Sequence, residues 1–195
     1  MTRVREHHRI VLIRHGETAW STTRRHTGRT DIELGPDGRT SAATVADLVR
    51  GWDFALVLSS PLSRAWDTAH LAGLDPIRDE DLLEWDYGVY EGLSTEEIRT
   101  SIPEWSVWTH EVVGGESLDQ VGARADRVID RATSADGDVA LVAHAHFLRI
   151  LAARWLGLPP VHGRDFTLDT ASMSVLGWER DTHVIQQWNV VRRPF

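Results

Sequence analysis

The sequence IVLIRHGET, residues 10–18, joins a short apolar run to a polar segment that contains a histidine. The run Ile10–Ile13 is too short to form a helix and is typical of a buried strand in a parallel sheet. Arg14, His15 and Gly16 follow this run without a break. The stretch therefore predicts a central strand that delivers an arginine and a histidine to its carboxyl end.

Two further apolar runs, Phe54–Leu58 and Val139–Ala143, repeat this arrangement. Apolar residues at helical spacing follow each of the three runs and predict crossover helices over residues 42–49, 65–72 and 148–155. The stretch Ser172–Val191 has no such helix and breaks at Asp181–Thr182, so we expect a hairpin added to the sheet. This order of elements predicts an α/β fold, a three-layer sandwich with a mostly parallel central sheet and helices on both faces.

Two local features complete the predicted organisation. Ser60–Pro61 has the composition of a helix N-cap followed by a first-turn proline, so we expect the second helix to begin there. Residues 84–117 are irregular and rich in Trp, Gly and Glu, and we interpret them as a lid inserted over the strand ends. The length of 195 residues, with 42% hydrophobic side chains, fits a single domain over residues 1–195.

The composition excludes several kinds of chemistry. The absence of cysteine removes disulfides, thiolate zinc sites and cysteine nucleophiles. All 21 lysine-or-arginine positions are arginine, which excludes Schiff-base chemistry on lysine and leaves guanidinium groups to bind oxyanions. The net charge of -8 disfavours nucleic acids and membrane surfaces as partners. Because no apolar run is long enough to span a bilayer and Met1–Arg9 is charged rather than signal-like, we expect a soluble, cytoplasmic protein.

Polar side chains gather where the predicted strands end. Arg14 and His15 follow the first strand, Arg64 lies one turn into the helix after the second, and His144 and His146 follow the third. The carboxyl ends of the strands share one edge of a doubly wound sheet, so these residues are expected to converge there beside helix N-termini. Two guanidinium groups and two or three imidazoles at one place favour a phosphate ligand.

The stretch Ile13–Thr18 is the first of several short motifs along the chain. The others are Thr27–Asp31, Ser59–Pro61 with Arg64 and Thr68, Leu83–Glu84 with Tyr87–Gly88 and Glu91–Gly92, Gly115–Ser117, and Ala143–His144. Over residues 10 to about 155 they resemble the histidine phosphatase (phosphoglycerate mutase-like) superfamily, above all its small bacterial acid phosphatases and sugar-bisphosphatase-like members. The resemblance implies a phosphoglycerate mutase-like fold and a phosphomonoester hydrolase for small phosphorylated molecules that needs no metal or cofactor.

The resemblance also assigns roles to individual residues. Neutral His15 would attack phosphorus in line and form a phosphohistidine that water then hydrolyses. Arg14 and Arg64 would bind the non-bridging oxygens, and His144, cationic in the complex, would stabilise the phosphoryl group in transfer. Glu84 stands at the family's position for the proton donor to the leaving group. Further substrate contacts are expected from Ser21, Thr27, Gly28, Tyr87, Ala145 and His146.

Some of these assignments have rivals in the sequence. Asp86 and Glu91 compete with Glu84 for the donor role, and Ser21 stands where many family members have an asparagine that contacts phosphate. His146 either lines the pocket or caps the helix. The pair His144 and His146 is also a common fragment of metallohydrolase sites, but no Asp–His pair or His–Glu helix motif nearby completes the ligands, and two arginines would repel a cation.

Two other functions stay open beside hydrolysis. A phosphoglycerate mutase would need extra basic residues after the Glu84 block, whereas residues 94–97 read Ser, Thr, Glu, Glu and residues 109–110 read Thr, His. We interpret this as an acidic lid that favours hydrolysis, with the mutase as the alternative. A non-catalytic binder of phosphorylated ligands would be expected to have lost the nucleophile or an arginine, and both are present.

The indoles of residues 85, 105 and 108 form either an apolar wall for the leaving group or packing within the lid.

Overall fold

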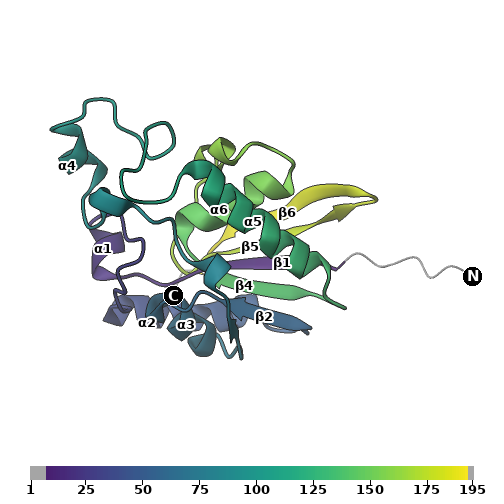
Figure 1. Cartoon of the computed structure of the whole chain (residues 1–195). Coiled ribbons are helices and arrows are strands. Elements are labelled where there is room, and N and C mark those ends of the chain that lie inside the picture. The colour runs from purple at the N-terminus through teal and green to yellow at the C-terminus, as the bar shows by residue number, and fades with distance from the viewer. Residues whose placement is uncertain (1–7, 193–195) are drawn as a thin grey trace, which may run out of the picture.

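A six-stranded sheet forms the centre of the computed structural model, which describes residues 8–192 (Figure 1). The strand order is β3-β2-β4-β1-β5-β6. The strands are β1 (Ile10–Arg14), β2 (Leu56–Ser59), β3 (Ile77–Arg78), β4 (Val139–Ala143), β5 (Met173–Glu179) and β6 (Thr182–Val190). Strands β1 to β4 pair in parallel, while β5 pairs antiparallel with both β1 and β6. The predicted mostly parallel sheet and its C-terminal hairpin are confirmed; both ends of the predicted domain, residues 1–7 and 193–195, lie outside the described residues.

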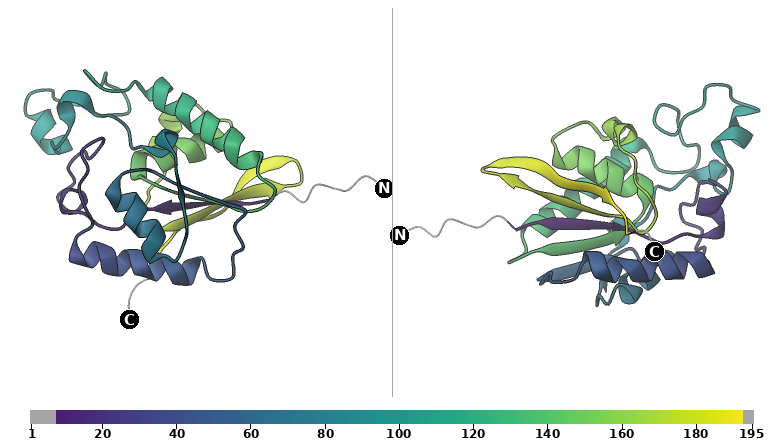
Figure 2. Two further views of the ribbon diagram at one scale, coloured as in Figure 1. Left: turned by 60° about the horizontal axis from the view of Figure 1, so that its bottom comes forward. Right: turned by 180° about the vertical axis from the view of Figure 1, so that it is seen from behind.

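Helices cover both faces of this sheet, as Figure 2 shows from two further sides. The α-helices are α1 (Ala19–Thr22), α2 (Pro36–Leu48), α3 (Ser63–Leu71), α4 (Thr95–Arg99), α5 (Leu118–Thr133) and α6 (Ala145–Trp155). Three short 3-10 helices are η1 (Glu80–Leu82), η2 (Gly88–Tyr90) and η3 (Pro160–Asp165). Helices α2 and α3 lie on one face and α5 and α6 on the other, so the predicted three-layer arrangement is confirmed.

The apolar run of β1 explains why the sheet is covered on both sides. Alternate side chains of a strand point to opposite faces. Ile10 and Leu12 belong to the core beneath α5 and α6, whereas Val11 and Ile13 belong to the core above α2 and α3. All four are buried, so the strand needs apolar residues at every position. This fixes the strand in the middle of the sheet and its carboxyl end at the edge where the polar residues gather.

The start of α3 differs from the sequence prediction. The N-cap is Leu62, and the first helical residue is Ser63 rather than Pro61. The backbone N–H of Ser63 donates to the carboxylate of Asp31 over 2.9 Å, so a side chain from another loop supplies the acceptor that Ser60 was expected to provide. The Ser60 hydroxyl lies instead 2.8 Å from a ring nitrogen of His144. The predicted cap was therefore wrong, and the Ser60 hydroxyl contacts the His144 ring instead.

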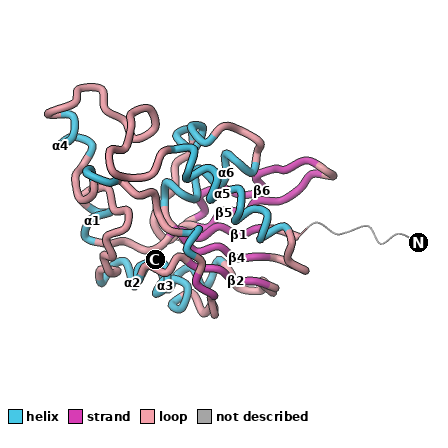
Figure 3. The backbone as a smooth tube through the Cα atoms, viewed as in Figure 1, coloured by secondary structure: helices cyan, strands magenta, loops and turns pink. Residues whose placement is uncertain are grey.

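Residues 84–117 contribute no strand to the sheet and run mainly as loops with η2 and α4 (Figure 3). Their apolar side chains nevertheless join the same core as the sheet and α5; the buried members include Trp85, Tyr90, Ile98, Trp105 and Val112. Within residues 8–192 no helix combines the length and apolar character required to cross a bilayer.

Candidate active site

Three backbone segments meet at the carboxyl ends of β1, β2 and β4. The N–H of His15 donates to the carbonyl of Ala143 over 3.0 Å, and the N–H of Ser60 donates to the carbonyl of Val142 over 2.9 Å. The loop after β1 then passes very close to α2, since a Cβ at Gly16 would lie 2.3 Å from the carbonyl oxygen of Gly38. Glycine at position 16 is thus required by close packing, which holds His15 at the strand end.

The hydrogen bonds of His15 leave one ring nitrogen available for attack. Its Nδ1 lies 2.6 Å from the carbonyl oxygen of Gly16, which can only accept, so Nδ1 carries the proton. Burial, followed by the positive charges of Arg64 and Arg14, lowers the pKa of His15 well below its usual value of 6.5. His15 is therefore neutral near pH 7, with an unprotonated Nε2, and its ring lies on the wall of a cavity.

His144 lies beside His15, with their ring centroids 5.1 Å apart. Arg64 Nε donates to Nδ1 of His144 over 3.1 Å, so the proton of the neutral ring is on Nε2, which faces the Ser60 hydroxyl. Burial, and then the charge of Arg64, lowers the pKa of His144 well below 6.5. We expected a cationic His144 in the complex; without a ligand it is neutral because Arg64 occupies its Nδ1 and supplies a neighbouring positive charge.

The two predicted arginines occupy different positions. Arg64 is fully buried and donates to the carbonyls of Thr27, Gly28 and Thr30 over 2.9–3.1 Å, and it does not line the cavity. Arg14 does line the cavity. Its Nη1 donates to the carbonyl of Leu168, whereas its buried Nε has no hydrogen-bond partner among the described residues. A phosphate oxygen would satisfy this donor, since buried N–H groups are rarely left unpaired.

The Glu84 carboxylate also lines the cavity, and it is held by the start of α6. The N–H groups of His146 and Phe147 donate to it over 3.1 and 2.9 Å, and the N–H of Trp85 donates over 2.9 Å. Its rivals have other positions: Asp86 accepts from the N–H of Gly88, and Glu91 accepts from the backbone of residues 28 and 30. Neither rival lines the cavity, so Glu84 is the one of the three carboxylates that reaches it.

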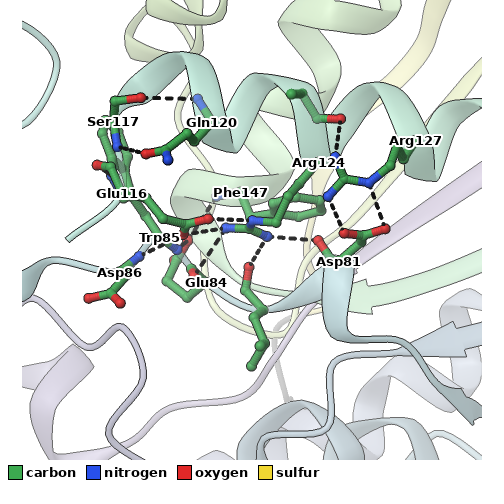
Figure 4. A network of polar contacts seen from close by, with 12 residues as sticks. Asp81, Glu84, Trp85, Asp86, Glu116, Ser117, Gln120, Arg124, Arg127 and Phe147 are labelled. Atoms are coloured by element: carbon green, nitrogen blue, oxygen red, sulfur yellow. Dashed lines mark hydrogen bonds and ion pairs between the residues drawn. The ribbon is translucent and has the colours of Figure 1, made fainter.

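A buried arginine of α5 holds the backbone that carries Glu84 (Figure 4). Arg124 donates to the carbonyls of Asp81, Leu83 and Glu84 over 2.7, 2.8 and 3.3 Å. Its other N–H groups form a bidentate pair with Glu116 at 2.7 and 2.8 Å. Burial alone would raise the pKa of Glu116, but the hydrogen bonds and charge of Arg124 outweigh it and the pKa is lowered. The ion pair with Glu116 and the hydrogen bond to the Glu84 carbonyl together tie both ends of segment 84–117 to α5.

The cavity has a volume of about 450 Å³ and a strongly basic lining. Its walls are formed by Arg14, His15, Ser21, Arg24, Arg25, His26, Thr27, Glu84, Tyr87, Thr95, Arg99, Ser106, Val107, Trp108, Ala145, His146 and Arg149. Five of these are arginines and Glu84 is the one carboxylate among them. The interpretation of an acidic lid was therefore wrong for the cavity itself: Glu96 is absent from the lining, and Glu97 forms an ion pair with Arg25.

Most of the predicted substrate-binding residues reach this cavity. Ser21, Thr27, Tyr87, Ala145 and His146 all line it. The Ser21 hydroxyl, however, is already bonded to the backbone of Thr18 as part of the α1 capping box, and the Tyr87 hydroxyl lies 2.5 Å from Nδ1 of His146. Gly28 contributes only its backbone, which bonds Arg64 and Glu91 behind the cavity wall. Of the three indoles considered, Trp108 lines the cavity, whereas those of residues 85 and 105 are buried in packing.

The two histidines of the possible metal fragment have separate partners. The ring of His144 is held between Arg64 and Ser60, and that of His146 faces Tyr87. Within residues 8–192 no group of three or more His, Asp or Glu side chains is arranged to hold a metal ion.

Sequence reasoning missed several residues of the cavity. Arg24, Arg25, Arg99 and Arg149 come from loops and helices that carry no recognisable motif, so no spacing rule connects them with His15. Ser60 was noted as a helix cap and as part of the Ser59–Pro61 motif but was given no role in the site, although it bonds His144. Arg124 had a detectable signal, because it lies in an amphipathic helix directly after the Gly115–Ser117 motif.

Comparisons with known proteins find relatives that match most of the chain. A family model described as the histidine phosphatase superfamily (branch 1) matches residues 10–191. The chain is 46% identical over 189 residues to an acid phosphatase of Mycobacterium tuberculosis, covering 94% of this chain and 92% of the relative. It is 29% identical to a probable phosphoglycerate mutase of Yersinia enterocolitica, over 92% and 89% of the two chains. A solved structure of an open reading frame product of M. tuberculosis superposes with a TM-score of 0.90 at 44% identity, covering 94% of this chain and 98% of that one.

Proposed function

The chain belongs to the histidine phosphatase superfamily, and we propose that it is a metal-independent phosphomonoester hydrolase acting through a phosphohistidine on His15. The observation that carries the proposal is the state of His15: a neutral ring on the cavity wall, with Nδ1 bonded to a carbonyl and Nε2 left unprotonated. A lone pair held in this way is suited to in-line attack on phosphorus.

The charged groups around His15 have complementary roles in the proposed reaction. Arg14, with its unpaired Nε, binds the transferring phosphoryl group from the cavity wall. Arg64, which does not line the cavity, orients His144 through a hydrogen bond and adds positive charge next to His15 and His144. His144 stays neutral in this arrangement, because a second proton on Nδ1 would oppose the Nε–H of Arg64, and it would stabilise the phosphoryl group in transfer by donating a hydrogen bond from Nε2.

Glu84 completes the proposed cycle on the leaving-group side. In the first step the Nε2–P bond forms and the P–O bond of the ester breaks, and Glu84 gives its proton to the departing alkoxide. In the second step Glu84 takes a proton from water, whose oxygen attacks the phosphohistidine and releases His15 and inorganic phosphate. Small phosphorylated molecules are the substrates implied by the acid phosphatase relative, and a cytoplasmic location is part of the proposal.

The test is release of inorganic phosphate from p-nitrophenyl phosphate and from a panel of sugar phosphates, with and without EDTA. We expect activity in both conditions and a loss of about 10³-fold or more in His15→Ala. The matched control is His70→Ala, an exposed histidine on α3 whose ring bonds only its own helix. Activity that disappears in EDTA and returns with zinc or magnesium would contradict metal independence.

A phosphoglycerate mutase is the second candidate. It is favoured by the arginine-rich cavity, because a mutase must bind a second acidic group of its substrate, and by the mutase relative. Interconversion of 3- and 2-phosphoglycerate with a trace of 2,3-bisphosphoglycerate, measured against phosphate release from the same substrates, separates the two. We expect phosphate release to be the faster reaction.

A further inference from the structure

The guanidinium of Arg14 is held by a loop that does not line the cavity. This loop, residues 166–172, connects η3 to β5, and none of its residues forms part of the cavity wall. Its Leu168 carbonyl accepts a hydrogen bond from Arg14 Nη1. The N–H of Arg14 also donates to the carbonyl of Ser172 over 3.1 Å. The loop therefore bonds both the side chain and the backbone of Arg14.

The Leu168 carbonyl decides how the Arg14 guanidinium is turned. Among residues 8–192 it is the one hydrogen-bond acceptor of this side chain, and the Nε of Arg14 is buried without a partner. A guanidinium is planar and its N–H groups point in fixed directions, so a bond that fixes Nη1 also fixes the direction of Nε. The donor proposed to bind phosphate is therefore directed by the position of the Leu168 carbonyl.

Two side chains of β6 hold the loop on either side of Leu168. Trp188 Nε1 donates to the carbonyl of Thr167 over 2.7 Å. Asn189 makes two bonds to Asp169: its Oδ1 accepts from the N–H of Asp169 over 2.7 Å, and its Nδ2 donates to the carboxylate over 3.1 Å. The residues directly before and after Leu168 are thus both bonded to β6.

The backbone of Asn189 departs from that of a regular strand. Its φ is 55°, in the left-handed region, which asparagine adopts more readily than most residues other than glycine. Its N–H donates to the Ser174 hydroxyl over 3.0 Å, and the register of β5 against β6 shifts between Met173 and Val175. Such irregularities redirect side chains, and strained backbone is commonly retained at functional sites. Here the irregularity accompanies the two bonds from Asn189 to Asp169.

The bonds of Asn189 also keep a negative charge near Arg14. Burial lowers the pKa of Arg14, and the charges of Glu84 and then Asp169 oppose this effect. Glu84 lines the cavity and is proposed to exchange its proton during the reaction, whereas Asp169 lies outside the cavity wall. Asp169 therefore supplies a negative charge near Arg14 that does not depend on the protonation of Glu84.

We propose that Asn189 is a positioning residue for Arg14. Through Asp169 it holds the Leu168 carbonyl, which orients the guanidinium toward the bound phosphoryl group. Asn189 does not line the cavity, so it acts through Arg14 and not on the substrate. This deepens the proposed function and rests on it for the identity of the group that Arg14 binds.

The first experiment is a double-mutant cycle on kcat/KM for p-nitrophenyl phosphate. Asn189→Gly removes both side-chain bonds and leaves a residue that adopts a φ of 55° without strain. We expect a loss of about tenfold, because a displaced guanidinium stabilises the transition state less well. In Arg14→Gln, which already lacks that guanidinium, Asn189→Gly should cause no further loss. The control Gln187→Ala changes an exposed residue of the same strand and should leave kcat/KM unchanged.

A measurement on Arg14 itself separates failure of this role from failure of the proposed reaction. In protein that contains isotopically labelled arginine, nuclear magnetic resonance relaxation gives the order parameter of the Arg14 Nε–H bond, whose signal is assigned by its absence in Arg14→Gln. We expect a rigid value of about 0.85 in the wild type and in Gln187→Ala, and a value below about 0.6 in Asn189→Gly.

The two measurements have different failures. An unchanged order parameter in Asn189→Gly, an unchanged kcat/KM, or an equal loss of kcat/KM with and without Arg14 would overturn the positioning role even if phosphate release is normal. A fall in the order parameter in a protein that releases no phosphate from any substrate would overturn the hydrolase and leave the positioning role supported.

Discussion

Arg64 Nε donates a 3.1 Å hydrogen bond to Nδ1 of His144, and both residues are fully buried. The same guanidinium satisfies the carbonyls of residues 27, 28 and 30. Arg64, which the sequence analysis expected to bind phosphate, thus also links His144 to the backbone of residues 27–30.

The first prediction follows from this double role. Arg64→Met should lower the free energy of unfolding by about 2–4 kcal/mol, because one buried carbonyl, two partly buried carbonyls and the Nδ1 of His144 lose their donor. Activity should fall as well. Urea unfolding followed by circular dichroism measures the change, with exposed Arg39→Met as control. A variant as stable as the wild type would show that Arg64 has no framework role.

The second prediction concerns Glu84 and the leaving group. Glu84→Gln should slow hydrolysis of glycerol phosphate by about 10²- to 10⁴-fold, since a poor leaving group needs a proton in the transition state, and should affect p-nitrophenyl phosphate less. Steady-state and burst kinetics on both substrates measure this. Asp86→Asn and Glu91→Gln are the controls. The assignment fails if Glu91→Gln reproduces the selective loss while Glu84→Gln is silent.

A third prediction tests whether Arg124 positions Glu84 through the backbone. Arg124→Gln should give the same leaving-group-dependent loss, about tenfold for glycerol phosphate, with KM little changed. Arg127→Gln is the matched control. Arg127 lies on the same helix, but its side chain is exposed and pairs with the carboxylate of Asp81. Equal loss on all substrates would indicate general destabilisation instead of positioning.

The fourth prediction is a fall in stability on acidification. The pKa values of His15, His144 and His146 lie well below 6.5, and burial lowers the pKa of His26 to about 4. Between these values and 6.5 the unfolded chain binds more protons than the folded one, so stability decreases as pH falls below 6.5. Each histidine contributes at most about 1.4 kcal/mol per pH unit to this loss of folding stability.

The Tm measured from pH 7 to pH 5 checks this slope. His26→Gln removes one of the four titrating groups and should flatten the slope by about a quarter. A Tm that rises on acidification over this range, or a slope unaffected by the substitution, would contradict the assigned protonation states.

Much of the fold could be predicted because its signals are local. The run Val139–Ala143 became β4 without a shift, and the break at Asp181–Thr182 falls at the turn between β5 and β6. Strand β3 has two exposed residues and no hydrophobic signal. Helix α5 went unpredicted although Ser117 and Gln120 form a capping box and Val121, Ala125 and Val128 follow helical spacing.

The charge of the cavity lining could not be predicted from the sequence, because it depends on tertiary contacts. The glutamates of residues 96–97 suggested an acidic lid, but Glu97 is bonded to Arg25, from a loop about seventy positions earlier in the chain. Likewise, the cap of α3 comes from Asp31 and not from Ser60. A charge in sequence says little about the potential in a cavity until its partner is known.

In the proposed reaction the phosphoryl group passes through Nε2 of His15. The direct measurement is mass spectrometry of peptides from protein mixed with phosphorylated substrate and quenched in alkali within milliseconds, since phosphohistidine is stable in base and labile in acid. We expect phosphorylation of the peptide that contains His15, its loss on acid treatment, and its absence in His15→Ala. Steady turnover with no phosphate on His15, or phosphate on another residue that supports turnover in His15→Ala, would contradict it.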